Sequence, residues 1–310
     1  MEFNHIPVML NECINGLNIK SDGIYFDGTL GGGGHSLEIL KKLNDNGLLI
    51  ATDRDSEALA FATNRLKEHK NKFIPVKDNF KNACKVFDDN NVLNIDGALL
   101  DLGVSSYQLD NRERGFSYMS SETKLDMRMD KENPFSAYEL INEYSYEKLK
   151  YVISTYGEEK FASNISKNII EQRKLKPITT TGELVEIIDK SIPYKFKKDG
   201  HPAKKTFQAI RIAVNEELDG LDTALYDIFN RLNKGGRLLV ITFHSLEDRI
   251  VKTVFKDLET ACTCDKRFPC VCGRTKKGLE ITKKPIIATS KECENNSRSI
   301  CAKLRIIEKL

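Results

Sequence analysis

The sequence has no long apolar segment. No run among its 310 residues approaches the ~18 apolar residues that a membrane span requires, and no apolar core of a signal peptide is found near the first methionine. We therefore expect a cytoplasmic protein that makes no use of a membrane. The net charge of only +3 argues for no particular partner, and no internal repeat indicates a solenoid. The length allows one large domain or two modest ones, with a substantial core.

The sequence also lacks a strict G-x-G-x-x-G, the fingerprint of dinucleotide-binding proteins. It does have the elements that surround such a loop. Residues 24–26 form a short apolar run typical of a strand, and four glycines, 31–34, follow. Apolar residues three apart after Ser36 predict a helix, and residues 48–51 predict a second strand that ends near Asp53. This order of strand, glycine loop, helix, strand and acid predicts the first half of a nucleotide-binding βαβ unit.

Two acids indicate which ligand this βαβ unit binds. A carboxylate at Asp53 can accept hydrogen bonds from both hydroxyls of a ribose, as in dinucleotide enzymes and in S-adenosylmethionine (SAM) methyltransferases. Asp27, at the end of the first strand, would repel a pyrophosphate but attract a sulfonium cation or an amino group. We therefore favour SAM over a nicotinamide dinucleotide. A flexible glycine loop that binds nothing is the remaining alternative.

Further strands and helices alternate along the chain. We expect a lead-in helix between Pro7 and Leu17, strands at 73–76, 95–100 and 235–243, helices at 57–66 and 246–258, and short strands near 286 and 304–307. From 108 to 211 no strand is expected, and helices are predicted at 146–154, 158–172, 180–190 and 206–217. The fold class is therefore α/β: a Rossmann-like SAM-methyltransferase sheet, formed by residues 1–107 and 212–310, with an inserted all-helical domain at 108–211.

In open α/β sheets ligands bind outside the carboxyl ends of the strands, so residues at those ends are candidates for the site. We assign Asp53 to the ribose and Phe80 to the neighbourhood of an adenine ring. Asp101 follows the fourth strand, where a substrate atom would meet the reactive carbon of the cofactor. A solvated loop acid is the ordinary alternative for Asp53 and Asp101, and a packed core residue is the alternative for Phe80.

Basic residues concentrate in two segments. Residues 190–211 hold seven lysines and arginines against one acid, and residues 266–291 hold eight against one. Two such segments on a balanced background are typical of a polyanion-binding surface, although an ordinary solvated face is the alternative for either one. Tyr194 and Phe196 lie among the lysines of the first segment, so aromatic and cationic groups are interleaved there.

Four cysteines are closely spaced in the second basic segment. Cys262, Cys264, Cys270 and Cys272 form the pattern C-x-C-x5-C-x-C. In a cytoplasmic protein such thiols are candidate ligands of a tetrahedral zinc ion. The C-x-C spacing is tighter than usual, so a reduced loop that contacts RNA and a pair of disulfides remain alternatives.

Longer motifs resemble one protein family. They are GIYFDGTLGGGGHS (23–36), DLGVSS (101–106), QLD (108–110), RGFS (114–117), LDMRMD (125–130), YGEE (156–159), HPA (201–203), TFQAIR (206–211), FHSLEDR (243–249) and SRS (297–299). With them the sequence resembles the RsmH/MraW family nearly from end to end. The resemblance implies a Rossmann-like domain with a helical insertion, and methylation by SAM of the exocyclic N4 of a cytidine in the decoding region of bacterial 16S ribosomal RNA.

The resemblance also implies the contacts of the cofactor. Carried over by motif, they are Gly33, Gly34, His35, Asp53, Phe80, Asp101 and Gln108. An exocyclic cytosine amine is a poor nucleophile, so it must be held in line with the sulfur–methyl bond and needs an acceptor for its proton. Asp101 is the candidate catalytic residue, either as that acceptor or as a group that orients SAM. Many amino-methyltransferases have prolines and an aromatic residue at this point, and this sequence lacks both. The residue that stacks on the target base is therefore unassigned: Tyr107 and Phe116 are candidates, and a packed core aromatic is the alternative for each.

A base in folded RNA must leave its stack before it can react, which costs a few kcal/mol. Lys204, Lys205 and Arg211 of the insertion are expected to offset this cost by contacting phosphates, and His244 is expected either to line the pocket or to begin a helix. The expected partner is 16S rRNA, as naked RNA or within the small ribosomal subunit. A non-catalytic rRNA-binding assembly factor and a nicotinamide-dependent oxidoreductase are the alternative functions, and the oligomeric state is left open.

Overall fold

The computed structural model describes residues 7–105, 108–109, 111–197, 200–264, 267 and 271–310. Clusters of contacts divide the chain into two compact units. Met1–Gly103 together with Asp219–Leu310 form the first, which we call the sheet unit. Val104–Leu218 form the second, which we call the helical unit.

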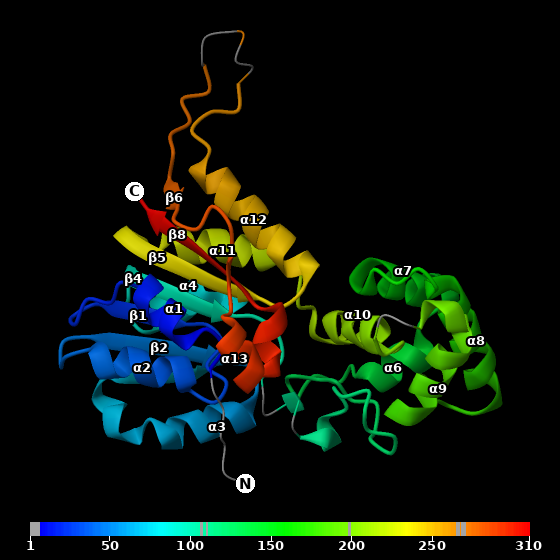
Figure 1. Cartoon of the computed structure of the whole chain (residues 1–310). Helices are drawn as coiled ribbons and strands as arrows, with labels where there is room; N and C mark the ends of the chain where they lie inside the picture. Colours follow the sequence, from blue (N-terminus) through cyan, green and yellow to red (C-terminus); the bar gives the residue numbers. More distant parts are fainter. Residues whose placement is uncertain (1–6, 106–107, 110, 198–199, 265–266, 268–270) are drawn as a thin grey trace. The chain divides into compact units, whose positions relative to one another are not determined.

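One mixed sheet organises the sheet unit, with the strand order β3-β2-β1-β4-β5-β8-β6 and with β7 paired to β8 (Figure 1). The strands are β1 (Ile24–Asp27), β2 (Leu48–Asp53), β3 (Phe73–Lys77), β4 (Ile95–Asp101), β5 (Leu232–Thr242), β6 (Gly278–Glu280), β7 (Ile286–Ile287) and β8 (Lys303–Lys309). Strands β1 to β5 are parallel, and β8 is antiparallel to β5. The chain runs outward from β1 to β3 and then returns to β4 on the other side of β1. This reversal creates the switch point at which ligands bind in such sheets.

Helices bury both faces of the sheet. Tyr25, Leu49 and Leu99 share a hydrophobic core with α1 (Leu10–Gly16), α2 (Gly34–Lys42) and α3 (Ser56–Arg65). The alternate residues Phe26 and Leu100 belong to a second core with α4 (Ala83–Asp89), α11 (Leu221–Asn230) and α12 (Ser245–Glu259). Strands buried on both faces read as continuous apolar runs, which is the pattern that these segments have in the sequence. The shorter elements are η1 (Lys67–Lys72), η2 (Phe80–Asn82), α13 (Ser290–Asn295) and η5 (Ser297–Cys301).

The helical unit has a core of its own. Its helices are α6 (Ala137–Glu143), α7 (Tyr146–Gly157), α8 (Ala162–Leu175), α9 (Thr181–Ser191) and α10 (Lys204–Asn215), with the short turns η3 (Arg112–Arg114) and η4 (Tyr194–Phe196). Leu140, Ile153, Ile165, Ile188 and Ile210 bring one residue from each helix into that core. The predicted start of α9 is confirmed: Thr180 and Glu183 form a capping box, in which each side chain bonds the backbone N–H of the other.

Several predicted boundaries were wrong. The helix expected from residue 158 begins only at Ala162, because Glu158 takes a left-handed conformation, with φ of 48°, that ends α7. The helices α4, α6, α11 and α13 and the strand β6 were not predicted. Two of these, α4 and α6, have only seven residues, which is too short for helical periodicity to stand out. In the described part of 108–211 the β-structure consists of a single bridge between Lys124 and Thr180.

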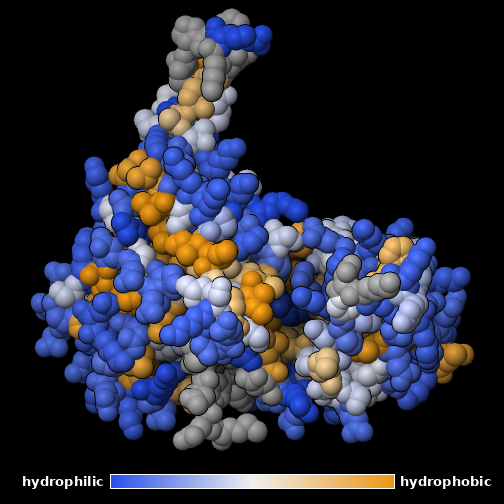
Figure 2. Space-filling model, viewed as in Figure 1, coloured by the Kyte–Doolittle hydropathy of each residue, from blue (hydrophilic) through white to orange (hydrophobic). Residues whose placement is uncertain are grey.

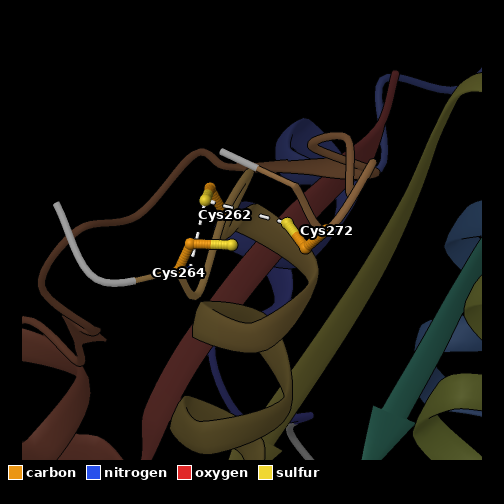
Figure 3. A group of neighbouring side chains, drawn as sticks. All are labelled: Cys262, Cys264 and Cys272. Atoms are coloured by element: carbon orange, nitrogen blue, oxygen red, sulfur yellow. Dashed lines mark hydrogen bonds between the residues drawn. The ribbon is translucent and has the colours of Figure 1, made fainter. Parts of the chain in front are cut away.

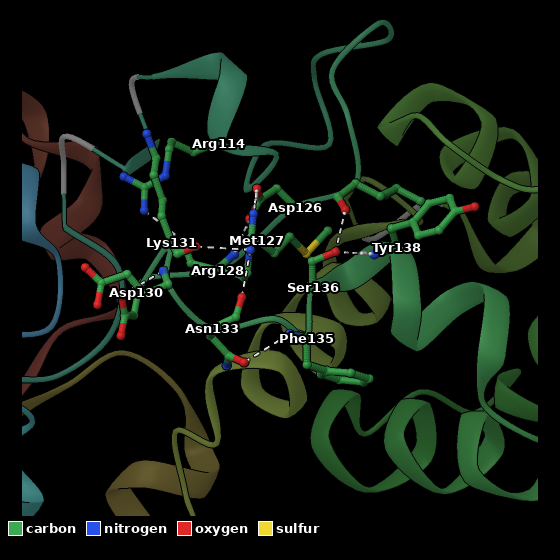
Figure 4. Close-up of polar contacts among 12 residues, drawn as sticks. Arg114, Asp126, Met127, Arg128, Asp130, Lys131, Asn133, Phe135, Ser136 and Tyr138 are labelled. Carbon is green, nitrogen blue, oxygen red and sulfur yellow. Dashed lines mark hydrogen bonds and ion pairs between the residues drawn. The ribbon is translucent and has the colours of Figure 1, made fainter.

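A network of arginine and aspartate fixes the loop that precedes α6 (Figure 4). The guanidinium of Arg128 donates to both carboxylate oxygens of Asp126, at 2.9 and 2.8 Å, and to the carbonyl of Asn133 at 2.7 Å. The buried Arg114 donates to the carbonyls of Arg128 and Met129 at 2.8 and 3.0 Å. Charged donors on otherwise unpaired carbonyls make an irregular loop rigid. The RGFS and LDMRMD motifs therefore have a structural function in the helical unit.

No helix in the described part of the chain is long and apolar enough to cross a membrane. In the space-filling view, hydrophilic residues cover most of the visible surface of each unit, and hydrophobic residues form separate patches (Figure 2). Patches of this kind are ordinary for protein surfaces, which are never wholly polar.

Candidate functional site

Three acids follow neighbouring strands at one edge of the sheet. The central strand β1 ends at Asp27, which pairs with Ala51 of β2 and with Leu99 of β4. Asp53 and Asp101 lie two residues beyond these partners, so they extend past the end of β1 on either side of it. Both are still paired within the sheet, Asp53 with Lys77 of β3 and Asp101 with Ile241 of β5. The parallel register thus brings together carboxyl groups that are distant in the sequence.

The carboxylate of Asp53 is held by the glycine loop. One oxygen accepts a hydrogen bond from the backbone N–H of Gly31 at 2.7 Å, and the other accepts from that of Asp55 at 2.8 Å. Burial raises the pKa of Asp53 to about 6, although these two hydrogen bonds oppose the shift. Each carboxylate oxygen has a second lone pair, so the oriented group can still accept from two ribose hydroxyls.

Asp27 is more deeply buried and is bonded within the same loop. Its oxygens accept from the hydroxyl of Ser36 at 2.6 Å and from the backbone N–H of Thr29 at 3.1 Å. Burial raises the pKa of Asp27, and the bonds from Ser36 and Thr29 act against that rise. The group is therefore an internal acid that orders the loop and contributes negative charge to the site.

The pKa of the Asp101 carboxyl is shifted strongly upward. Burial raises its pKa to about 8, and repulsion by Asp27 and Glu247 adds to the effect. Its Oδ1 atom is buried and has no hydrogen-bond partner among the described residues. An unpaired polar atom of this kind is costly, and it marks a place where a ligand donor or cation would be favoured.

His35 faces Asp101 in its neutral form. Its Nε2 lies 3.0 Å from the carbonyl oxygen of Val8, so the proton is assigned to that nitrogen. The bare Nδ1 then faces Asp101, at 3.9 Å from Oδ2, which is too long for a hydrogen bond. Burial lowers the pKa of His35 to about 4. The ring therefore carries no charge near neutral pH and leaves the unpaired oxygen of Asp101 available.

The glycines of the loop are required by backbone geometry and packing. Gly33 has a φ of 72°, a left-handed conformation that L side chains rarely adopt, and it caps α2. At Gly34 a Cβ atom would lie 2.3 Å from Cγ of Pro7, which is an impossible contact. These constraints explain both glycines without a ligand, and their predicted contact with the cofactor stays a prediction.

The aromatic candidates have different environments. Phe80 begins η2, three residues after the end of β3, and packs, partly buried, against the core that includes Leu100. Phe116 is only 7% exposed and belongs to the core of the helical unit, which favours the packed alternative over base stacking. Tyr107 lies outside the described residues. Gln108 is buried in the helical unit, where its side-chain oxygen accepts from the backbone N–H of Ser105 at 3.1 Å.

The four predicted RNA contacts fall into two groups. Lys204 and Lys205 are exposed at the start of α10. Arg211 instead donates from Nε and Nη2 to the two carboxylate oxygens of Glu217, both at 2.9 Å, so its charge is already balanced. His244 is the N-cap of α12 and forms a capping box with Glu247. The structure thus favours the helix-start alternative for His244.

Two residues at the site were missed by the sequence analysis. The hydroxyl of Thr29 accepts a 2.7 Å hydrogen bond from the backbone N–H of Asp101, which links the glycine loop to the end of β4. Glu247, only 2% exposed, accepts from the backbone N–H of Phe243 at 2.9 Å and repels Asp101. Thr29 lies two residues after a strand-end acid, a position from which hydroxyls commonly bond loop backbone, and this signal could have identified it.

Three of the four predicted zinc ligands lie together in the sheet unit. Sulfur atoms of Cys262, Cys264 and Cys272 are all within 4.8 Å of one another (Figure 3). Cys270 lies outside the described residues.

A mostly parallel sheet, with a glycine loop after β1 and an acid at the end of each of β1, β2 and β4, defines the class of Rossmann-like, nucleotide-binding α/β proteins. Comparison with known proteins narrows this class: the chain belongs to the MraW methylase family, whose model matches residues 2–310. Two curated proteins named ribosomal RNA small subunit methyltransferase H, from Clostridium botulinum strains Loch Maree and Kyoto, are each 56% identical to it over 311 aligned residues, covering 100% of both chains.

Among solved structures, an rRNA methylase from Streptococcus thermophilus matches 99% of this chain with 99% of its own, at 12% identity and a TM-score of 0.41. The family membership confirms the predicted methyltransferase activity with SAM as methyl donor, on a Rossmann-like sheet with a helical insertion. The alternatives of an oxidoreductase and a non-catalytic assembly factor are thereby set aside.

Proposed function

We propose that this protein methylates the exocyclic N4 of a cytidine in the decoding region of 16S rRNA, within the small ribosomal subunit of the bacterial cytoplasm. Identity of 56% over the whole length to proteins named for small-subunit rRNA methylation supports the substrate class. The structural observation that carries the mechanism is the buried, unpaired carboxyl of Asp101 at the end of β4.

The residues at the sheet edge fit the proposed donor. Asp53 is oriented by two backbone N–H groups and retains lone pairs for ribose hydroxyls. Burial and repulsion by Asp27 and Glu247 raise the pKa of Asp101, so a cation at the sheet edge would favour the ionised carboxyl. When bound, SAM supplies an electrophilic methyl group on a positively charged sulfur. The acids therefore favour the charged donor over its neutral demethylated product.

The same electrostatics support a catalytic function for Asp101. With no cation nearby, its carboxyl keeps a proton up to about pH 8. A positive charge at the sheet edge favours the ionised form and lowers this pKa. The ionised Asp101 can then accept a hydrogen bond from the cytosine amine, orient its nitrogen and receive the proton that the amine releases. His35, neutral and held by Val8, keeps the adjacent space free of competing charge.

We assign the two units different tasks. The sheet unit would hold the donor, and the helical insertion would bind the RNA. Lys204 and Lys205 support this division, since both are exposed cations in a basic segment. Arg211 contributes less in this proposal, because Glu217 already balances its charge.

Methyl transfer from labelled SAM tests the proposal. Small subunits that lack the modification and naked 16S rRNA would be assayed in parallel, and the product nucleoside identified by mass spectrometry. We expect N4-methylcytidine with wild-type protein, and loss of turnover in Asp101→Ala on the order of 100-fold or more. Asp53→Ala should instead weaken SAM binding by roughly 10-fold or more in calorimetry.

The controls separate the parts of this proposal. Asp45→Ala changes an exposed acid after α2 and should retain wild-type binding and turnover. Wild-type turnover in Asp101→Ala would remove that residue from the mechanism. A methyl group found on any other atom or base would contradict the proposed substrate.

A further inference from the structure

The segment between α12 and β6 carries a cluster of thiols that methyl transfer does not use. Cys272 donates from its Sγ to Sγ of Cys262 across 3.7 Å, and all three sulfur atoms, including that of Cys264, lie within 4.8 Å of one another. The backbone N–H of Cys264 also donates to Sγ of Cys262 at 3.3 Å. Figure 3 shows these side chains converging from the two sides of the loop.

These distances distinguish between two uses of the thiols. A disulfide needs sulfur atoms about 2.0 Å apart, which is far shorter than the observed 3.7 Å. In a tetrahedral zinc site the Zn–S bond is about 2.3 Å, so neighbouring sulfur atoms are separated by about 3.8 Å. The separation of Cys262 and Cys272 therefore matches the edge of a zinc–thiolate tetrahedron. An N–H donor on Cys262 would further stabilise its thiolate.

Ion pairs and a backbone hydrogen bond anchor the base of the loop. At the base, Arg274 pairs with Asp257 at 2.7 Å, Lys276 pairs with Glu259 at 3.0 Å, and the backbone N–H of Lys277 donates to the carbonyl of Leu258 at 3.0 Å. Further out, Val271 is 88% exposed. The described thiols therefore lie next to a part of the loop whose backbone is held in place.

We propose that Cys262, Cys264 and Cys272 bind one zinc ion as thiolates, leaving one position of the tetrahedron to a further ligand. Binding replaces three thiol protons with the metal, so the three thiolates and the divalent ion carry a net charge of −1, which the basic residues of the segment offset. This proposal does not depend on the identity of the RNA substrate.

Metal analysis of the full-length protein, purified under reducing conditions and incubated with zinc, tests the site. We expect about one zinc per chain in the wild type, and a roughly 10-fold or greater loss in Cys262→Ser and in Cys272→Ser. Cys301→Ser is the matched control, because Cys301 is exposed but lies outside this loop, in η5. Replacement of zinc by cobalt should produce thiolate-to-metal charge-transfer bands and the absorption bands of tetrahedral cobalt in the wild type and in Cys301→Ser. The variants Cys262→Ser and Cys272→Ser should lack these bands.

A second measurement uses only the wild-type chain, in case a variant folds poorly. A thiol reagent should react with fewer cysteines in the zinc-loaded protein than in the same protein after treatment with a strong chelator. Negligible zinc in the loaded wild type would overturn the proposal. So would equal zinc in Cys262→Ser and wild type, or a thiol count that the chelator does not change.

Discussion

At the scale of single residues, the candidate site places unfavourable charges close together. Asp101 is buried beside Asp27 and Glu247, and its Oδ1 lacks a partner in the described part of the chain. A core built for stability alone would not hold this carboxyl. The arrangement is explained if a positively charged donor binds at the sheet edge, because the cation would favour the ionised acids.

The raised pKa of Asp101 should make the stability of the folded protein depend on pH. The pKa rises from an ordinary 3.8 to about 8 in the folded protein. Between these values the unfolded chain has lost a proton that the folded protein retains, so the contribution of Asp101 to stability falls as the pH rises through this window. Asp101→Asn removes this penalty. We expect it to match wild type near pH 4 and to be more stable by several kcal/mol near pH 8, since each unit of pKa difference corresponds to about 1.4 kcal/mol.

Denaturant unfolding at the two pH values measures this difference. Asp45→Asn, at an exposed acid, controls for general effects of charge. A difference between Asp101→Asn and wild type that stays constant from pH 4 to pH 8 would show that Asp101 ionises normally in the folded protein.

At the scale of elements, irregular segments are positioned by side chains that bond backbone groups. The buried Asn215, at the end of α10, donates to the carbonyl of Met127 and accepts from the backbone N–H of Met129, both at 2.7 Å. It thus bonds the loop before α6 much as a neighbouring strand would. Met127 has a φ of 58°, so the loop adopts a conformation that needs such external support.

Asn215→Ala should therefore destabilise the helical unit. It leaves a buried carbonyl and a buried N–H without partners, and we expect a cost of about 2–4 kcal/mol in the free energy of unfolding. Chemical denaturation followed by circular dichroism would measure it. Asn164→Ala, at an exposed site on α8, should change stability by no more than about 0.5 kcal/mol. Equal stability of the two variants would mean that Asn215 does not support the loop.

At the scale of the whole molecule, the proposed division of labour separates binding of the donor from binding of RNA. The three strand-end acids belong to the sheet unit, whereas Lys204 and Lys205 belong to the helical unit. An exposed lysine that contacts a phosphate contributes mainly through the release of counterions. Its loss should then weaken RNA binding in a salt-dependent way and leave the affinity for SAM unchanged.

The double substitution Lys204→Ala and Lys205→Ala tests this separation. We expect the slope of log affinity for rRNA against log salt to become shallower by about 1–2, because each lost phosphate contact reduces it by about one. Filter binding at several salt concentrations measures the slope, and calorimetry measures SAM binding. Lys41→Ala, on α2 of the sheet unit, is the control. An unchanged slope in the double variant would place the RNA contact elsewhere.

The sequence by itself determined the five parallel strands, the glycine loop and the acids at the strand ends, because apolar runs and strand-terminal polar residues are local signals. The short edge strand β6 has no such run and was not predicted. It could not indicate which short segments become helices: α4 and α6 are ordered by packing that their own residues do not encode. Nor could it separate Lys204 from Arg211, because only the folded chain brings Glu217 onto the guanidinium.

Tertiary structure alone decided the chemical state of the site. Spacing in the sequence placed Asp101 after a strand, but burial and the approach of Asp27 and Glu247 raise its pKa. In the same way, the bond to Val8 and the burial of the ring make His35 neutral. The physical reason is that the free energy of a charge depends on its surroundings in three dimensions, which residues distant in the sequence supply.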